Sequence, residues 1–496
     1  MRLALVTALL LSLGTQRSAL AQAPTSPDVS RLVAGLEGDT PMLRDLEQLT
    51  DVIGGRATGS PANLRAVEWA MARFQEAGVS AKREPFRMPT RWLERAASAT
   101  VQGGSGAGAV RFTPRVAAMP FSKGTSAAGV SAPLVDAGIG DSAAFARLGA
   151  AARDAFVLVE QGELKDVDGL FKEYADAAAI EQRAYAAGVK GVVYMGSRPN
   201  DLLYRHNVAI GDKNTRPMLV MERDGAARAL RLIRAGTPLT LTAVLDLDDG
   251  GAYDSYNVIG EIRGSTKPDE IVLLGAHLDS WDLGGGALDN GANVAMLIDV
   301  ARQMTRLGIH PQRTIRFALW NGEEQGMVGS MGYAASHAAE LDRHAMAAAF
   351  DIGCGKINGF FTGGRPELAA RMPAVLSPVA GLGPFTQIDA PIVGTDNFDF
   401  MLHGVANLVA NQEPASYGPN YHARSDEYDR CDPQQLRLNA AVSAAVALGF
   451  ANAPDRLPRQ TRADVEALMA RTDLAEQMKT FDVWDGWAAG TRGRRQ

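Results

Sequence analysis

Two stretches of the chain alternate short apolar runs with amphipathic segments, which is the pattern of an α/β fold. In the first stretch, "DAFVLVEQG", "GVVYMG" and "RPMLV" predict short buried strands, and "AAIEQRAYAAG" predicts a helix between the first two. In the second, which begins near Tyr253, the runs "EIVLLGAH", "TIRFALWNG", "HAMAAAFDIG" and "VANLVAN" predict strands. Helices are expected between these runs at 292–307, 326–341 and 395–404, and a long helix follows at 434–450. We therefore expect a doubly wound mixed sheet with helices on both faces, together with a smaller α/β domain.

The segments outside these stretches are predicted in less detail. Residues 22 to about 45 look like a leader into the first helix, and Ser60-Pro61 is a plausible helix start. After Pro458 the chain is polar with one amphipathic stretch at 463–478 and a basic end, "TRGRRQ". We expect a docked helix and a frayed tail there.

The first residues have the features of a signal peptide. Arg2 precedes an apolar stretch from Leu3 to Leu13, and Ala19-Leu20-Ala21 fits a cleavage site. We expect residues 1–21 to be removed and the mature chain to be secreted or periplasmic; a buried N-terminal helix is the alternative. No other segment approaches ~18 uninterrupted apolar residues, so no membrane span is expected.

Composition narrows the function classes. The chain has 496 residues, of which 46% are apolar and 21% charged, with a net charge of −6. It lacks the basic excess that would suggest nucleic acid as a partner. Cys354 and Cys431 are the two cysteines. In an oxidising compartment they could form one disulfide, and separate buried thiols are the alternative.

In the second stretch, every predicted strand end carries a possible metal ligand. The candidates are His277, with Asp279 two residues on, Asp289 in a Gly-rich loop, Glu323 and Glu324, Asp351, and His422 in a later loop. Ligand sites of doubly wound folds lie beyond the carboxyl ends of the strands. A mixed nitrogen and oxygen set of this kind suits Zn²⁺ and related divalent ions. Two histidines and three carboxylates of this set would make five ligands. Five exceed the three usual at one catalytic zinc and suit two ions about 4 Å apart, and an extra carboxylate would remain for proton transfer.

The motifs that carry these residues resemble those of a known family. "HLDSWDLGGGALDNG", "WNGEEQGMVGS", "FDIG" and "YHARSDEYD" are similar, in this order, to motifs of the co-catalytic zinc exopeptidases that include bacterial leucyl aminopeptidases. Within that family they are most similar to the carboxypeptidase Q group. The resemblance covers residues 45–458 and includes "GGRATGS". It implies a zinc exopeptidase fold with an inserted protease-associated domain. The peptidase would consist of residues 22–117 and 251–458, the insert of residues 118–250, and a C-terminal extension of residues 459–496.

The resemblance also implies a role for each residue. His277 and Asp351 would bind one zinc ion, Glu324 and His422 the second, and Asp289 both, giving two Zn²⁺ per chain, with Glu323 as the general base. Asp279 would orient His277. Tyr421 would stabilise the oxyanion, as a tyrosine does in a related glutamate carboxypeptidase, although the carboxypeptidase Q group has a histidine there.

Some neighbouring residues are weaker candidates. Asp426 could anchor the loop of His422, and Trp281 is expected to pack as a wall. Asp399 could help to shape the pocket, whereas Asp396 is expected to cap a helix. Some relatives have a cis peptide bond after the bridging aspartate, and whether it is retained here, where Asn290 follows, is a hypothesis.

The resulting functional hypothesis is a secreted dinuclear zinc exopeptidase acting on short peptides. It would hydrolyse the N-terminal peptide bond of short peptides or dipeptides through a metal-bridging hydroxide. The sequence leaves the oligomeric state open, and a homodimer is one possibility because relatives often dimerise. Two alternatives of the same fold are a receptor-like binding protein without catalysis and a single-zinc glutaminyl cyclase. Metal content would separate the three hypotheses: about two ions per chain for the exopeptidase, none for the binding protein and one for the cyclase.

Overall fold

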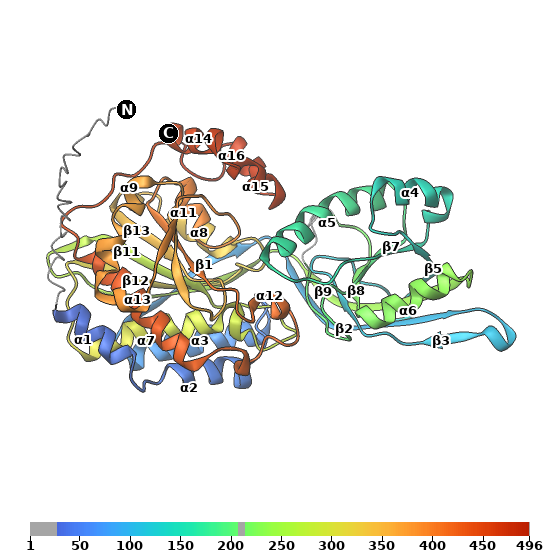
Figure 1. The fold of residues 1–496 in the computed structure, drawn as a ribbon, viewed down its shortest axis with the longest axis horizontal. Helices are drawn as coiled ribbons and strands as arrows, with labels where there is room; N and C mark the ends of the chain where they lie inside the picture. Colours follow the sequence, from blue (N-terminus) through green and yellow to red (C-terminus); the bar gives the residue numbers. More distant parts are fainter. Residues whose placement is uncertain (1–26, 207–213, 496) are drawn as a thin grey trace, which may run out of the picture.

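The computed structural model describes residues 27–206 and 214–495, whose strands form two eight-stranded sheets (Figure 1). The expected signal peptide lies outside the described residues. Within these residues, no helix combines the length and the apolar character that a bilayer span requires.

The first sheet has parallel strands at its centre and antiparallel strands beside them. β11 pairs in parallel with both β12 and β13, and β13 pairs in parallel with β16. The four strands predicted after Tyr253 are thus confirmed as neighbours. In spatial order the sheet consists of β1 (Ser80–Met88), β10 (Tyr253–Ile262), β12 (Arg313–Trp320), β11 (Lys267–His277), β13 (His344–Ala349), β16 (Asn407–Gln412), β14 (Ile357–Phe361) and β15 (Thr386–Ile388).

Helices cover both faces of this sheet because its central strands are apolar on both sides. Along β11, Val272 and Leu274 join the core on one face, whereas Ile271 and Leu273 join the core on the other. The first face packs against α1 (Pro27–Leu36), α2 (Met42–Glu47), α3 (Pro61–Glu76), α7 (Ala292–Arg306) and α13 (Pro433–Ala451). The second packs against α8 (Val328–Ser336) and α11 (Phe398–Leu402).

The second sheet belongs to a separate module that is inserted between β1 and β10. Its strands, in spatial order, are β3 (Val110–Phe112), β2 (Arg91–Gly103), β9 (Leu239–Gly250), β5 (Val130–Asp136), β6 (Phe156–Val159), β7 (Gly191–Met195), β8 (Met218–Met221) and β4 (Val116–Ala118). Its helices are α4 (Ser142–Leu148), α5 (Val167–Ala187) and α6 (Arg223–Arg234). Met88 pairs with Tyr253 and Arg91 with Gly250, so the chain enters and leaves the module at adjacent points.

The chain passes from the first sheet to the second sheet before residues 117 and 118, where the domain boundary was expected. The second sheet already includes β2, β3 and β4, so the division falls between Met88 and Arg91. The sequence "RWLERAASATVQG" of β2 gives only a weak strand pattern because it mixes charged residues with alanines. We call residues 91–250 the inserted module.

The C-terminal extension, residues 459–496, is helical in its described part. It contains α14 (Arg462–Arg471), α15 (Leu474–Thr480) and α16 (Trp484–Ala488), so the expected amphipathic stretch is two helices instead of one. Three further short helices are α9 (Pro366–Ala369), α10 (Met372–Val375) and α12 (Tyr417–Asn420). The fold class expected from the sequence, a doubly wound mixed sheet with helices on both faces and an added α/β module, is confirmed.

Candidate metal centre

The candidate ligands meet at the carboxyl edge of the first sheet. His277 is the last residue of β11, Glu323 and Glu324 follow β12, and Asp351 follows β13. Because these three strands are parallel neighbours, the residues that follow them reach the same edge. Asp289, just before α7, and His422, after α12, are brought to the same edge by their loops.

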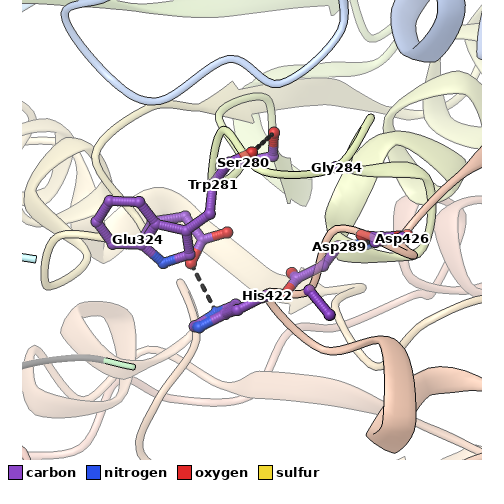
Figure 2. Close-up of a pocket in the computed structure, with 9 residues that line it drawn as sticks. Ser280, Trp281, Gly284, Asp289, Glu324, His422 and Asp426 are labelled. Atoms are coloured by element: carbon purple, nitrogen blue, oxygen red, sulfur yellow. Dashed lines mark hydrogen bonds and ion pairs between the residues drawn. The ribbon is translucent and has the colours of Figure 1, made fainter. Parts of the chain in front are cut away.

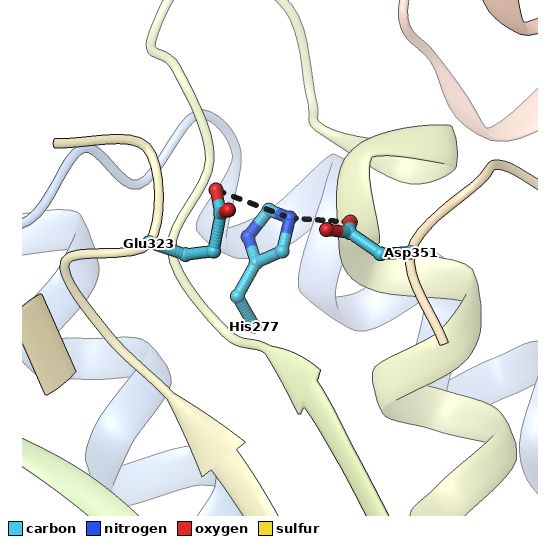
Figure 3. Close-up of side chains that lie close together, drawn as sticks. All are labelled: His277, Glu323 and Asp351. Atoms are coloured by element: carbon cyan, nitrogen blue, oxygen red, sulfur yellow. Dashed lines mark hydrogen bonds and ion pairs between the residues drawn. The ribbon is translucent and has the colours of Figure 1, made fainter. Parts of the chain in front are cut away.

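His277 is close to three of the predicted carboxylates. Its Nε2 atom lies 2.9 Å from Oδ1 of Asp351 and 3.1 Å from Oδ1 of Asp289. Glu323 lies on the other side of the imidazole, with Oε2 4.0 Å from the same nitrogen (Figure 3). All four side chains are almost completely buried.

His422 forms a second group with Glu324. Its Nε2 atom lies 2.9 Å from Oε2 of Glu324 and 3.5 Å from Oδ2 of Asp289 (Figure 2). Asp289 therefore presents one carboxylate oxygen to each histidine. A carboxylate shared in this way can serve two ions.

The electrostatics of the cluster show an excess of negative charge. Burial raises the pKa of Glu323 well above its usual value, and repulsion from Asp351 adds to the effect. Burial likewise raises the pKa of Glu324, followed by repulsion from Asp289. Burial alone would lower the pKa of His277, but Asp351 and the neighbouring acids outweigh it and raise this pKa. Buried carboxylates of this kind require a compensating positive charge.

The donor atoms are of the kind and spacing that zinc binds. Oδ2 of Asp289 and Oε1 of Glu324 are buried without a hydrogen-bond partner, so donor capacity is left for a cation. Zinc–nitrogen and zinc–oxygen bonds are about 2.0–2.2 Å long, which puts two donors of one ion roughly 3 Å apart. The separations of 2.9–3.5 Å between the imidazole nitrogens and their carboxylates are of this size. Burial lowers the pKa of His422 to about 4, which keeps the ring in the neutral form that binds metal.

The second nitrogen of His277 is fixed mainly by a backbone group. Its Nδ1 atom lies 3.0 Å from the backbone carbonyl oxygen of Asp279 and 3.6 Å from Oδ1 of the same residue. The carboxylate that we expected to orient the ring is thus the more distant partner. Its other oxygen accepts hydrogen bonds from Oγ1 of Thr58, at 2.7 Å, and from the amide of Gly322, at 3.0 Å.

Asp426 anchors a different loop from the one we expected. Its carboxylate accepts hydrogen bonds from the amides of Leu288, at 2.6 Å, and Asp289, at 3.1 Å. Asp426 therefore supports the backbone of the loop that carries Asp289. Burial raises its pKa to about 7. The peptide bond between Asp289 and Asn290 is cis, as in the relatives considered above.

Arg205 of the inserted module fixes the second nitrogen of His422. The backbone carbonyl of Arg205 lies 3.1 Å from Nδ1 of the ring, and its amide donates to the carbonyl of His422 at 3.0 Å. The guanidinium group binds both carboxylate oxygens of Asp282, at 2.9 Å, and one oxygen of Glu94, at 2.6 Å. No local motif marks Arg205, since its partners are far away in sequence.

Arg56 holds the Gly-rich loop between His277 and Asp289. Its guanidinium is fully buried and donates to the carbonyl oxygens of Leu278, Gly285 and Gly286 at 2.6–2.8 Å. Burial lowers its pKa to about 10, while Asp426 and nearby acids act in the opposite direction. "GGRATGS" thus contributes a positive charge and a brace for the loop.

We expect Arg56→Gln to lower the free energy of unfolding by about 3 kcal/mol or more, because buried carbonyl groups lose a charged donor. Urea denaturation followed by circular dichroism measures this. Arg44→Gln, which changes an exposed arginine of α2, is the control and should leave the midpoint unchanged. Equal midpoints for the two variants would show that Arg56 does not brace the loop.

Aromatic side chains surround the histidine loop. The ring of Tyr421 stacks on that of His422 at 3.6 Å, and its hydroxyl lies 3.0 Å from the hydroxyl of Tyr174 in α5. Trp281 is buried and packs edge-on against Trp92 and His422, each at 6.2 Å, which agrees with a structural wall.

A pocket lies over the acid cluster. Glu323, Glu324, Asp289, Asp351 and His422 line it together with aromatic residues, including Tyr421. A second, smaller pocket lies between Trp281, Glu324, His422 and Asp426 (Figure 2). Glu323 thus faces the first of these pockets.

The structure also places the two cysteines, Asp399 and Asp396. Cys354 and Cys431 form a disulfide, with Cα atoms 5.4 Å apart, which joins the segment after Asp351 to that after His422. Asp399 does not line the cavity over the acid cluster but forms an ion pair with Arg492 of the extension. Asp396 precedes α11 without capping it, because the N-cap is Asn397.

Comparison with known proteins supports a peptidase fold. Residues 257–447 match the model of peptidase family M28. Carboxypeptidase Q of Rattus norvegicus is 34% identical over 206 residues, which cover 42% of this chain and 43% of the relative. The match thus spans less than half of that relative's length.

Two solved structures share the fold over most of their length. A peptidase M28 precursor from Shewanella amazonensis has a TM-score of 0.77 and 28% identity, covering 87% of this chain and 99% of the other. A zinc aminopeptidase from Bacillus subtilis has a TM-score of 0.66 and 20% identity, covering 84% and 96%.

Proposed function

We propose that this chain, whose residues 257–447 match the model of peptidase family M28, is a zinc exopeptidase that hydrolyses the N-terminal peptide bond of short peptides or dipeptides. The observation that carries the proposal is the position of Asp289 between two histidines, each of which has a second carboxylate beside it. His277 and Asp351 would hold one ion, Glu324 and His422 the other, and Asp289 both.

Glu323 is the proposed general base. Zinc bound at this site would supply positive charge that polarises a scissile carbonyl and lowers the pKa of water. Glu323 faces the pocket beside His277, and burial raises its pKa well above the usual value. A carboxylate in this position can act as a general base. It would take a proton from the attacking water and deliver it to the leaving amine.

The ligand set of the pocket is compatible with recognition of the peptide N-terminus. Four carboxylates line it, whereas no lysine or arginine does so among the described residues. Two zinc ions would balance these four negative charges, and one of the ions could hold the free α-amino group of a peptide. Tyr421 lines the same cavity, and we propose that its hydroxyl stabilises the oxyanion.

The setting of the enzyme is part of the same proposal. We propose an exported, homodimeric protein whose inserted module is a protease-associated domain. The disulfide between Cys354 and Cys431 supports export, because disulfides persist in oxidising compartments.

Metal analysis of the purified chain, together with peptide assays, tests the proposal. About two zinc ions per chain, and chelator-sensitive release of the first residue from dipeptides and aminoacyl amides, are expected. One ion with cyclisation of N-terminal glutamine would support the cyclase instead. Absence of both metal and turnover would support a binding protein.

A further inference from the structure

Side chains from three distant parts of the chain meet over the acid cluster. Phe481 follows α15 in the C-terminal extension, Tyr174 lies in α5 of the inserted module, and Tyr421 precedes His422. The ring centres of Tyr174 and Phe481 are 5.8 Å apart, and the hydroxyl groups of Tyr174 and Tyr421 are 3.0 Å apart. All three side chains line the pocket that Glu323 also lines.

The contact between Tyr174 and Phe481 bridges two separate bodies. The inserted module and the extension extend from different sides of the peptidase sheet, and α5 and α15 approach each other across the site (Figure 1). The two rings therefore form a bar across the space above the carboxylates. We call this pair the aromatic bar.

Phe481 is held by a docked segment rather than a loose tail. Leu474 and Met478 of α15 share an apolar core with Val393 and Phe398. The side chain of Gln477 also accepts a hydrogen bond from the amide of Val393 at 3.0 Å. Such packing keeps Phe481 in place before any substrate arrives.

The ion pair of the extension secures it further. Arg492 donates to Oδ1 of Asp399 at 2.9 Å and to Oδ2 at 2.6 Å, and Asp399 is buried. A bidentate pair of this kind fixes orientation as well as distance. The extension is therefore positioned to define the shape of the cavity.

We propose that the aromatic bar limits the length of the peptide that can reach Glu323, so that the preferred substrates are dipeptides and tripeptides. The inference rests on the proposed function and adds a role for the extension to it. By this proposal, a short peptide would bind beneath the bar, whereas a longer one would need the space that the two rings occupy. The aromatic bar would then select peptides by length at the binding step.

Peptides that share their first two residues test this proposal, because the N-terminal side chain is then constant. With Leu-Gly, Leu-Gly-Gly and Leu-Gly-Gly-Gly-Gly, we expect kcat/KM of the native chain to fall by about tenfold or more from the dipeptide to the pentapeptide. Phe481→Ala should raise kcat/KM for the pentapeptide by about tenfold, mainly through KM, and change the value for the dipeptide by less than about twofold.

Two comparisons distinguish a specific effect of the aromatic bar from a general loss of structure in the variants. Trp484→Ala changes an aromatic residue of the same extension that does not line the cavity, and should keep the native length profile. Tyr174→Ala should relax the length limit, whereas Tyr174→Phe, which keeps the ring, should retain it. A measurement of the thermal midpoint confirms that each variant is folded.

Binding provides a readout that does not depend on turnover. In the Glu323→Gln variant, calorimetry should show weak binding of the pentapeptide. In the double variant with Phe481→Ala, the affinity for the pentapeptide should be about tenfold higher. Identical length profiles and affinities with and without Phe481 would overturn the inference while leaving dipeptide hydrolysis, and thus the proposed function, intact. A change in side-chain preference among dipeptides without a change in length profile would also overturn it. If the native chain hydrolyses no peptide, the proposed function fails, and the affinities alone then decide whether the bar selects by length.

Discussion

Glu323→Gln is expected to lower kcat by about 100- to 10,000-fold, because the variant loses its general base. Glutamine has nearly the same size as glutamate but cannot take a proton from water. Glu323 is also assigned to neither zinc ion in our proposal, so zinc content should remain at about two per chain. Steady-state assays on a dipeptide and elemental analysis of the same samples measure the two quantities.

Glu413→Gln is a matched control, because Glu413 is exposed just after β16. It should retain the native kcat. Native turnover in Glu323→Gln would rule out the assigned base, and loss of zinc from that variant would mean that Glu323 is a ligand. The second outcome has a structural basis, since Glu323, His277 and Asp351 could form a three-residue metal group.

Asp289→Ala is expected to remove both zinc ions and to lower kcat/KM by at least about 1,000-fold, because both proposed sites share this carboxylate. The same change removes one of several buried carboxylates that repel one another in the metal-free protein. The metal-free variant should therefore unfold at a higher temperature than the metal-free native chain.

Thermal unfolding with and without a chelator checks these expectations. The native chain should lose stability when zinc is removed, since the metal binds only the folded state, whereas Asp289→Ala should not respond. Asp269→Ala, which changes an exposed acid at the start of β11, should behave as the native chain. Two bound ions in Asp289→Ala would contradict the shared-ligand arrangement.

The peptidase sheet could be predicted because its strands have distinctive sequences. The runs that end at His277, Trp320 and Ala349 are apolar and short, and parallel neighbours bring their following residues to one edge. The candidate ligands at that edge therefore followed from the sequence. The roles given to them remain proposals.

Other parts depend on contacts that local sequence does not encode. β2 contains few large apolar residues, so the local sequence gives little sign that it belongs to the second sheet. The "RTDLA" stretch ends α14 at Arg471 and starts α15 at Leu474, because Thr and Asp favour helix ends over interiors. Arg205 and Tyr174 reach the site from the inserted module, and Phe481 does so from the extension, across long distances in sequence.

The carbonyl of Arg205 has a consequence for attempts to trim this protein to its smallest active unit. A residue of the inserted module orients a histidine of the peptidase domain, so the module cannot be excised as an independent accessory. A truncated chain lacking residues 91–250 would leave the imidazole of His422 free to rotate and choose the wrong tautomer. Any variant that lost the insert would need a new acceptor at the same point to hold the same tautomer of His422.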